Sequence, residues 1–89
     1  MYVVAIHSIS NPRAFWGAQL DLPEGTTLPT AVPSEDGTRG ICIFESDSVD
    51  TVRNLVESAA GQISKNEYFA VDEQNAQGLQ SRATMAQRS

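Results

Sequence analysis

The chain is poor in the residues that most often carry chemistry. It contains one histidine and one cysteine among 89 residues. A single cysteine permits no internal disulfide, and a metal centre needs three or four ligands at a regular spacing that the scattered carboxylates do not supply. We therefore expect neither a disulfide scaffold nor a dedicated metal site.

Basic residues are also scarce. Lys and Arg together number six against eleven acidic residues, which gives a formal net charge of -5. Nucleic-acid backbones and anionic bilayers are bound chiefly by clustered Lys and Arg, and here these residues are scattered. No nucleic acid and no membrane surface is expected as a partner.

Long apolar runs and the common cofactor motifs are missing too. No stretch approaches the ~20 apolar residues of a membrane span, and Met1 to His7 lacks the features of a secretory signal. We therefore expect a cytoplasmic protein. The chain has no glycine-rich phosphate loop and no serine nucleophile elbow, so nucleotide binding and the commonest hydrolase chemistry are unsupported and no cofactor is expected.

The strand-like segments that are present are apolar on both faces. Tyr2 to Ile6 and Gly40 to Phe44 are nearly continuous hydrophobic runs. A strand with one face in water would alternate apolar with polar residues instead. The pattern therefore predicts a sheet that is covered on both sides.

The predicted order of elements is strand, helix, strand, strand, helix, strand. The expected bounds are Tyr2 to Ile9, Pro12 to about Leu20 or Leu22, Leu28 to Val32, Thr38 to Glu45, Ser48 to Gly61, and Glu67 to Val71. Pro29 and Pro33 predict a short, bulged or edge strand, Asp36-Gly37 predicts a turn, and Gly61 predicts a left-handed helix cap. This order is that of an α+β fold with two helices on one face of a four-stranded antiparallel sheet.

Such a fold leaves one apolar face of the sheet without cover. Each large apolar side chain contributes about 1.5–3 kcal/mol when it is fully buried, which is large against the stability of a small domain. A second copy of the chain would cover this face, so a homodimer is expected.

Three segments carry a resemblance to a known family, namely Thr38 to Ser46, Ser48 to Val52, and Asn66 to Asp72. They resemble small ferredoxin-like proteins of the dimeric α+β barrel superfamily. In that superfamily a third strand ends in an acidic turn, a helix begins with a Ser-Val-Glu/Asp-type segment, and a final strand closes the sheet. The first strand with His7 is similar to that of short uncharacterised bacterial members whose first strand finishes with one or two histidines.

The resemblance, over about residues 1–79, implies a ferredoxin-like homodimer with a ligand cavity between the sheet and helices of each protomer. The superfamily includes polyketide cyclases, cofactor-free monooxygenases, haem proteins and small-molecule sensors, so the fold says little about chemistry. Cyclase-type members use a histidine on the first strand together with a second histidine or a tyrosine. This chain matches only the first, at His7, and has no other histidine.

Four residues are candidates for a site. His7 titrates near neutrality and could shuttle a proton, and Tyr68 could donate one into the same cavity. Phe15 and Trp16 could line the pocket of an apolar or aromatic organic ligand. Each has a structural alternative: His7 as a packed residue, Phe15 as core, Trp16 at a helix edge or dimer rim, and Tyr68 as a strand packing residue. Cys42 is expected to be a buried, inert core residue.

These expectations describe one domain over residues 1–79 and an arm or tail over residues 80–89. Two function classes follow. One is a cofactor-independent enzyme of the cyclase or monooxygenase type, and the other is a non-catalytic ligand-binding or structural dimer. A cavity of at least about 300 Å³ reached by His7 would favour the enzyme, and a filled core would favour the other class.

Overall fold

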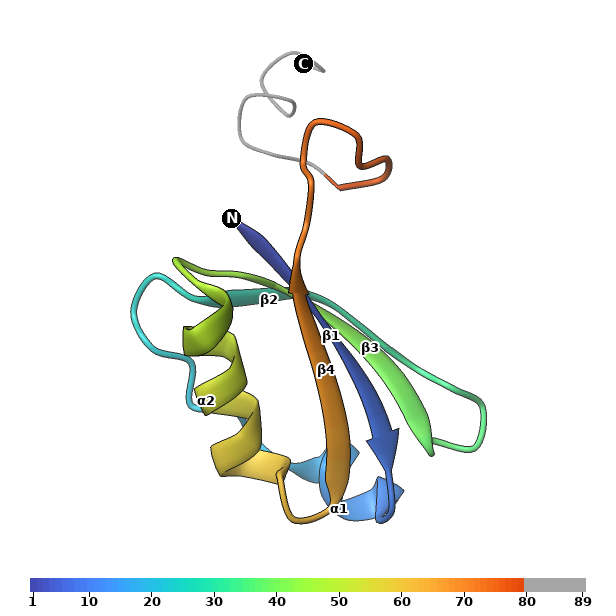
Figure 1. Ribbon diagram of the computed structural model, residues 1–89. Coiled ribbons are helices and arrows are strands. Elements are labelled where there is room, and N and C mark those ends of the chain that lie inside the picture. The colour runs from blue at the N-terminus through green and yellow to red at the C-terminus, as the bar shows by residue number, and fades with distance from the viewer. Residues whose placement is uncertain (80–89) are drawn as a thin grey trace.

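A computed structural model describes residues 1–79 of the chain. Its elements follow the predicted order (Figure 1). They are β1 (Tyr2–Ile9), α1 (Pro12–Gly17), β2 (Thr27–Pro33), β3 (Arg39–Glu45), α2 (Val49–Ala60) and β4 (Ser64–Ala70). Residues 80–89, for which an arm or tail was predicted, lie outside the part that the structure describes.

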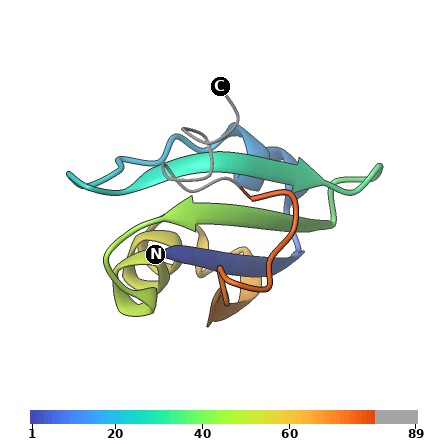
Figure 2. The ribbon, with the colours of Figure 1, turned by 90° about the horizontal axis from the view of Figure 1, so that it is seen from above.

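The four strands form one antiparallel sheet in the order β2-β3-β1-β4. Figure 2 shows β2 (teal), β3 (green) and β1 (blue) side by side. Because every neighbouring pair is antiparallel, β1 runs parallel to β2, and β3 runs parallel to β4. Each helix therefore connects two parallel strands that have one strand between them. The predicted α+β class is confirmed.

Both helices lie on one face of the sheet, as predicted. The core on that face is a cluster contributed by β1, β3 and α2: Val3, Ala5, Cys42, Phe44, Val52 and Val56. Phe15 of α1 packs against His7, which alternation along β1 places on the same face as Val3 and Ala5. Figure 1 shows α2 beside β4 and α1 at the lower end of the strands.

The prolines of β2 have the effect predicted from the sequence. β2 is an edge strand, and its pairing with β3 shifts register between Thr27 and Thr30, on either side of Pro29. A proline has no N–H to give to the ladder, so it is tolerated at an edge or a bulge. The turn that follows has Gly37 at a φ of 76°, and Asp36 accepts hydrogen bonds from Ser34 and Thr38.

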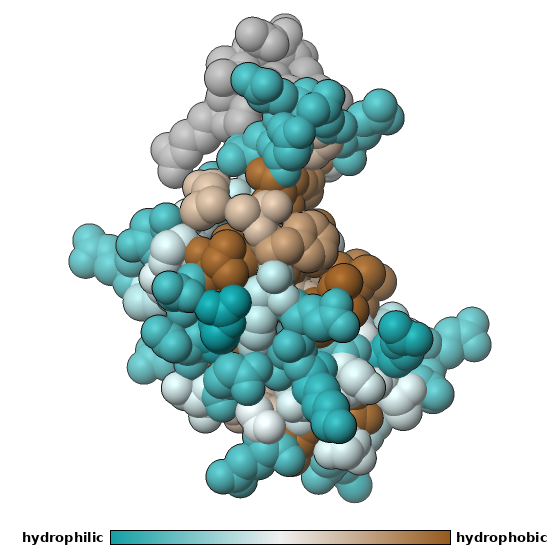
Figure 3. Space-filling model, in the orientation of Figure 1, coloured by the Kyte–Doolittle hydropathy of each residue, from teal (hydrophilic) through white to brown (hydrophobic). Residues whose placement is uncertain are grey.

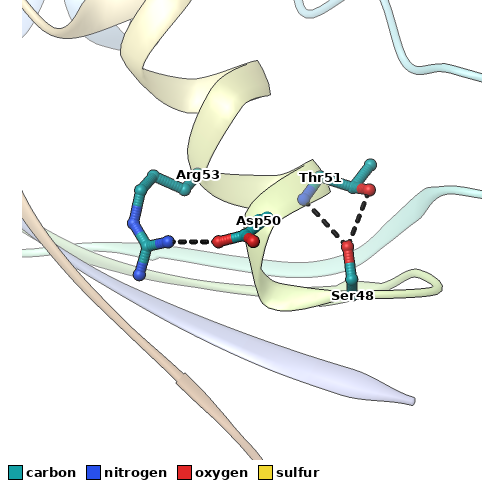
Figure 4. A network of polar contacts seen from close by, with 4 residues as sticks. All are labelled: Ser48, Asp50, Thr51 and Arg53. Carbon is teal, nitrogen blue, oxygen red and sulfur yellow. Dashed lines mark hydrogen bonds and ion pairs between the residues drawn. The ribbon is translucent and has the colours of Figure 1, made fainter.

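The N-terminus of α2 is capped by side chains (Figure 4). The Ser48 hydroxyl accepts a hydrogen bond from the Thr51 N–H, and Asp50 pairs with Arg53 one turn further along. At the other end, the predicted left-handed cap is wrong. Gly61 has a φ of -62° and donates its N–H to the Glu57 carbonyl, so the backbone stays right-handed past the end of the helix.

Two predicted boundaries are wrong in ways that matter for the site. α1 ends at Gly17 instead of reaching Leu20 or Leu22, because Ala18 is already extended and glycine is a poor helix former. β4 begins at Ser64 instead of Glu67. The prediction missed its first three residues because they are polar and give no strand pattern. The earlier start pairs Asn66 with His7 across the sheet.

Neither helix within residues 1–79 is long and apolar enough to cross a membrane. After β4, Asp72 accepts hydrogen bonds from the Gln74 N–H and the Asn75 side chain, which forms a polar turn.

Candidate functional site

A cavity of about 200 Å³ lies between the sheet and the helices. Its wall is mostly apolar and includes His7, Phe15, Trp16, Ala18, Leu20, Leu28, Ala31, Cys42, Phe44, Val56, Ala59 and Ala60. Ala18, Ala31 and Ala59 are solvent-exposed, so they mark the mouth of the cavity. Three of the four predicted site residues, His7, Phe15 and Trp16, meet here.

His7 is the central polar residue of this wall. It projects from β1, one of the two central strands, and has only 1% of its surface exposed. Its Nδ1 lies 2.6 Å from Oδ1 of Asn66 on β4. Its Nε2 is also buried and has no hydrogen-bond partner among the described residues. An unpartnered buried nitrogen costs free energy, so it is an exception that needs an explanation.

Asn66 connects His7 to a carboxylate on α2. Its Nδ2 donates to Oε2 of Glu57 at 2.9 Å, and the Tyr68 hydroxyl donates to the same oxygen at 2.6 Å. These two hydrogen bonds lower the pKa of Glu57, which stays ionised at neutral pH. A continuous polar chain therefore runs from the buried imidazole to an exposed carboxylate.

The surroundings of His7 keep it neutral. Burial lowers the pKa of His7 below its usual 6.5, since the charged imidazolium is poorly solvated there. The hydrogen bond with Asn66 and the negative charge of Glu57 act in the opposite direction but are smaller. A neutral imidazole has one donor nitrogen and one acceptor nitrogen, so His7 can accept a hydrogen bond or a proton.

Two aromatic rings form one side of the cavity. Phe15 packs against the imidazole of His7, with ring centroids 4.8 Å apart, and Trp16 meets Phe15 edge to face. The indole N–H of Trp16 donates to the Gly37 carbonyl at 2.9 Å, which ties α1 to the β2–β3 turn. Neither ring is fully buried, so both remain available to a ligand.

Tyr68, the fourth predicted site residue, lies outside the cavity wall. Its hydroxyl points to Glu57, and burial together with this hydrogen bond raises the pKa of Tyr68. Tyr68 therefore stays protonated and supports Glu57. Sequence reasoning missed Glu57 and Asn66, because Glu57 is an ordinary exposed helix position and Asn66 fell in a segment without strand pattern.

Cys42 lies in the cavity wall and in the core at the same time. It is 5% exposed, and burial raises the pKa of its thiol to about 11. A thiol with such a pKa is almost entirely protonated at neutral pH and is a poor nucleophile. The predicted inert character of Cys42 agrees with this environment.

The helix-free side of the sheet carries an apolar surface, which we call the open-face patch. It consists of Val4, Ile6, Val32, Ile41, Ile43 and Phe69, placed on one face by their pairing in the sheet. Val32, Ile41 and Phe69 are 55%, 44% and 49% exposed. Figure 3 shows hydrophobic side chains gathered on the right-hand flank of the molecule, over the strands.

Residues 1–79 contain no group of three or more side chains placed to hold a metal ion. Comparison of the chain with protein-family models, with curated proteins and with solved structures finds no match.

Proposed function

We propose that this chain forms a homodimer that binds a small, mainly apolar organic molecule in the cavity between sheet and helices. One observation carries the proposal. The cavity wall is mostly apolar, and its central polar residue is His7, whose Nε2 is buried without a partner among the described residues. Ligand pockets typically combine apolar walls with a few polar groups that orient the ligand.

The size of the cavity limits the ligand. His7 reaches the cavity, but the cavity volume of about 200 Å³ is below the roughly 300 Å³ that would favour the enzyme, and the core is not filled either. Drug-sized ligands occupy pockets of roughly 300–1,000 Å³, whereas an apolar cavity of about 150 Å³ is large enough for benzene. A molecule with one ring fits the cavity, and a multi-ring molecule would need the mouth to widen.

The arrangement of strands supports the ferredoxin-like variant of the α+β class. Each helix joins two parallel strands with one strand between them, which is the split βαβ connection. This connectivity is what the resemblance to the dimeric α+β barrel superfamily implies. We propose membership of that superfamily on this ground.

The open-face patch supports a second copy of the chain as its cover. Full burial of a large apolar side chain contributes about 1.5–3 kcal/mol, so each of its half-buried residues would gain about half of that. Such patches on soluble proteins commonly mark interaction sites. A twofold interface uses the same surface on both partners, and an apolar sheet face is complementary to itself.

The charges at the two ends of this face favour one orientation. Arg39 and Lys65 flank Ser8 at one end, and Glu45 lies beside Tyr2 at the other. If the strands of the two sheets run in opposite directions, the basic end of each protomer faces the acidic end of its partner. We propose this antiparallel arrangement for the dimer.

The binding proposal is tested by filling the mouth of the cavity. Ala31 lines the cavity and is exposed, so Ala31→Leu should narrow the mouth without disturbing the core. Ala14 is exposed and does not line the cavity, so Ala14→Leu is the matched control. We expect phenol, titrated by NMR, to shift cavity resonances in the natural chain and in Ala14→Leu but much less in Ala31→Leu. Equal binding by all three proteins, or none by the natural chain, would refute the proposal.

A second candidate function is proton transfer, and the state of His7 favours it. A buried imidazole that is neutral at pH 7 can take a proton from a bound molecule, as a cofactor-independent cyclase-like or monooxygenase-like enzyme requires. Exchange of a carbon-bound acidic proton of a bound molecule for deuterium from D₂O solvent, measured by NMR, would reveal this activity. His7→Gln should abolish the exchange. An unchanged rate in this variant would reject the enzyme and favour the non-catalytic binding module.

A further inference from the structure

Asn66 has one orientation that suits its two partners. The carboxylate of Glu57 only accepts hydrogen bonds, so the group of Asn66 that faces it must be the NH₂. The amide oxygen therefore faces His7, at 2.6 Å from Nδ1. The exposed carboxylate of Glu57 therefore fixes which way the half-buried amide group of Asn66 points.

This orientation fixes the proton on His7. An amide oxygen has no hydrogen to give, so Nδ1 must be the nitrogen that carries one. In a neutral imidazole the other nitrogen, Nε2, is then an acceptor. Nε2 is the buried atom without a partner among the described residues.

The other polar atoms of the cavity wall do not compete for the same role. The indole N–H of Trp16 is engaged by the Gly37 carbonyl, and the Cys42 thiol is only a weak hydrogen-bonding group. Nε2 has almost no accessible surface, and the ring of Phe15 packs against the imidazole. Because Phe15 is the ring that packs on the imidazole, its side chain is the one expected to move when a ligand reaches Nε2.

We infer that Glu57 and Asn66 are positioning residues that hold His7 as a hydrogen-bond acceptor, so that the cavity selects single-ring molecules carrying a hydroxyl or N–H donor. The inference rests on the proposed ligand-binding function. A site built around a hydrogen bond rejects analogues that lack the matching group, because its own polar atom is then left buried and unpaired. Phenol should therefore be preferred to toluene, which has a similar size.

The first arm of the test needs no ligand. ¹⁵N NMR of the free protein should show His7 with a protonated Nδ1 and an unprotonated Nε2. Asn66→Ala should give a mixture of tautomers, and Glu57→Gln should shift the population in the same direction. Glu35→Gln, the same change at an exposed turn residue, should have no effect. A protonated Nε2 in the natural chain would overturn the inference.

The second arm compares phenol with toluene by NMR titration. We expect phenol to bind at least tenfold more tightly, with the preference lost in Asn66→Ala and kept in Glu35→Gln. Phe15→Leu should strengthen phenol binding, because the smaller leucine side chain is easier to displace from the imidazole. Equal affinities would overturn the inference while leaving the binding function intact. If neither phenol nor toluene binds, both the proposed ligand-binding function and the proposed ligand class are refuted. The tautomer measurement still decides whether Glu57 and Asn66 position His7.

Discussion

The indole ring of Trp16 covers Gly40 so closely that a Cβ atom there would lie 2.5 Å from Cζ2 and 2.6 Å from Cη2. Gly40 is paired with His7 across the sheet, so the ring lies beside the candidate site. We predict that Gly40→Ala displaces Trp16 and lowers the free energy of unfolding by about 1–3 kcal/mol, as overpacking does. Urea denaturation followed by tryptophan fluorescence measures both effects, since the chain has one tryptophan.

Gly17→Ala is the matched control for this prediction. A Cβ atom at Gly17 would meet nothing within 4 Å, so stability and fluorescence should stay close to those of the natural chain. If Gly40→Ala behaved in the same way, the contact between Trp16 and β3 would be absent in solution.

Folding stability should fall as the pH drops below about 6.5. In the unfolded chain His7 takes up a proton near pH 6.5, whereas burial lowers the pKa of His7 in the folded chain. The unfolded state then binds more protons, so the free energy of unfolding falls by up to about 1.4 kcal/mol per pH unit until the folded pKa is reached. Urea denaturation between pH 5 and 7.5 measures this slope.

The His7→Gln variant should lose this slope, although its stability at pH 7 should also be lower because a buried hydrogen bond is disturbed. The lowered pKa of Glu57 acts only below about pH 4.5, outside this window. If the free energy of unfolding changed with pH equally in the natural chain and in His7→Gln, His7 would not be the group that causes the pH dependence.

Cys42 should react slowly with alkylating reagents. With a pKa of about 11, the thiolate fraction at pH 8 is about 10⁻³, so alkylation should be roughly two orders of magnitude slower than for an ordinary thiol. The rate should rise about tenfold per pH unit up to pH 10 and fall when phenol fills the cavity. Mass spectrometry follows the reaction, with the urea-unfolded chain as reference. A folded chain that reacted as fast as the unfolded one would place Cys42 at the surface.

The chain should be a dimer at about 10 µM in sedimentation equilibrium. Ile41→Asp and Phe69→Asp place a charge within the open-face patch and should shift the equilibrium toward monomer. Asn54→Asp, an equally exposed change on α2, should leave the dimer intact. A natural chain that is monomeric at this concentration would contradict the proposed assembly.

Charge reversal tests the orientation of the dimer. In the antiparallel arrangement Arg39→Glu places like charges at each end of the interface, and so does Glu45→Arg. Both variants should dissociate more readily, and the double variant should recover much of the affinity, since the complementary ends are restored. Unchanged affinity in both single variants and in the double variant would favour a parallel arrangement, because each end would then face its own copy and meet a like charge whatever its sign.

The elements with strong local signals could be predicted from the sequence. β1 and the core of β3 were predicted by continuous apolar runs, and the bulged edge character of β2 by its prolines. These features follow from backbone chemistry and hydrophobic pattern, which are local. The α1 boundary and the Gly61 cap were wrong: Gly17, a poor helix former, ends α1 early, and Gly61 keeps a right-handed backbone.

The candidate site was predicted only in part. His7, Phe15 and Trp16 were found because histidine and aromatic residues are conspicuous in a chain that has few of them. Asn66 and Glu57 could not be found, because their role depends on the register of β4 against β1 and on the packing of α2. The catalytic role suggested for His7 and Tyr68 stays a prediction.

The short helix α1 and the mouth of the cavity are where ligand recognition can change during evolution. Two aromatic side chains of the cavity wall, Phe15 and Trp16, come from α1, yet no residue of α1 is buried and none belongs to the core cluster. Substitutions at exposed positions usually change stability by less than about 0.5 kcal/mol. Mutations at the exposed alanines of the mouth, Ala18, Ala31 and Ala59, can therefore alter recognition while the fold keeps its thermodynamic margin. Descendants of such a chain could acquire new ligands without first acquiring a new scaffold.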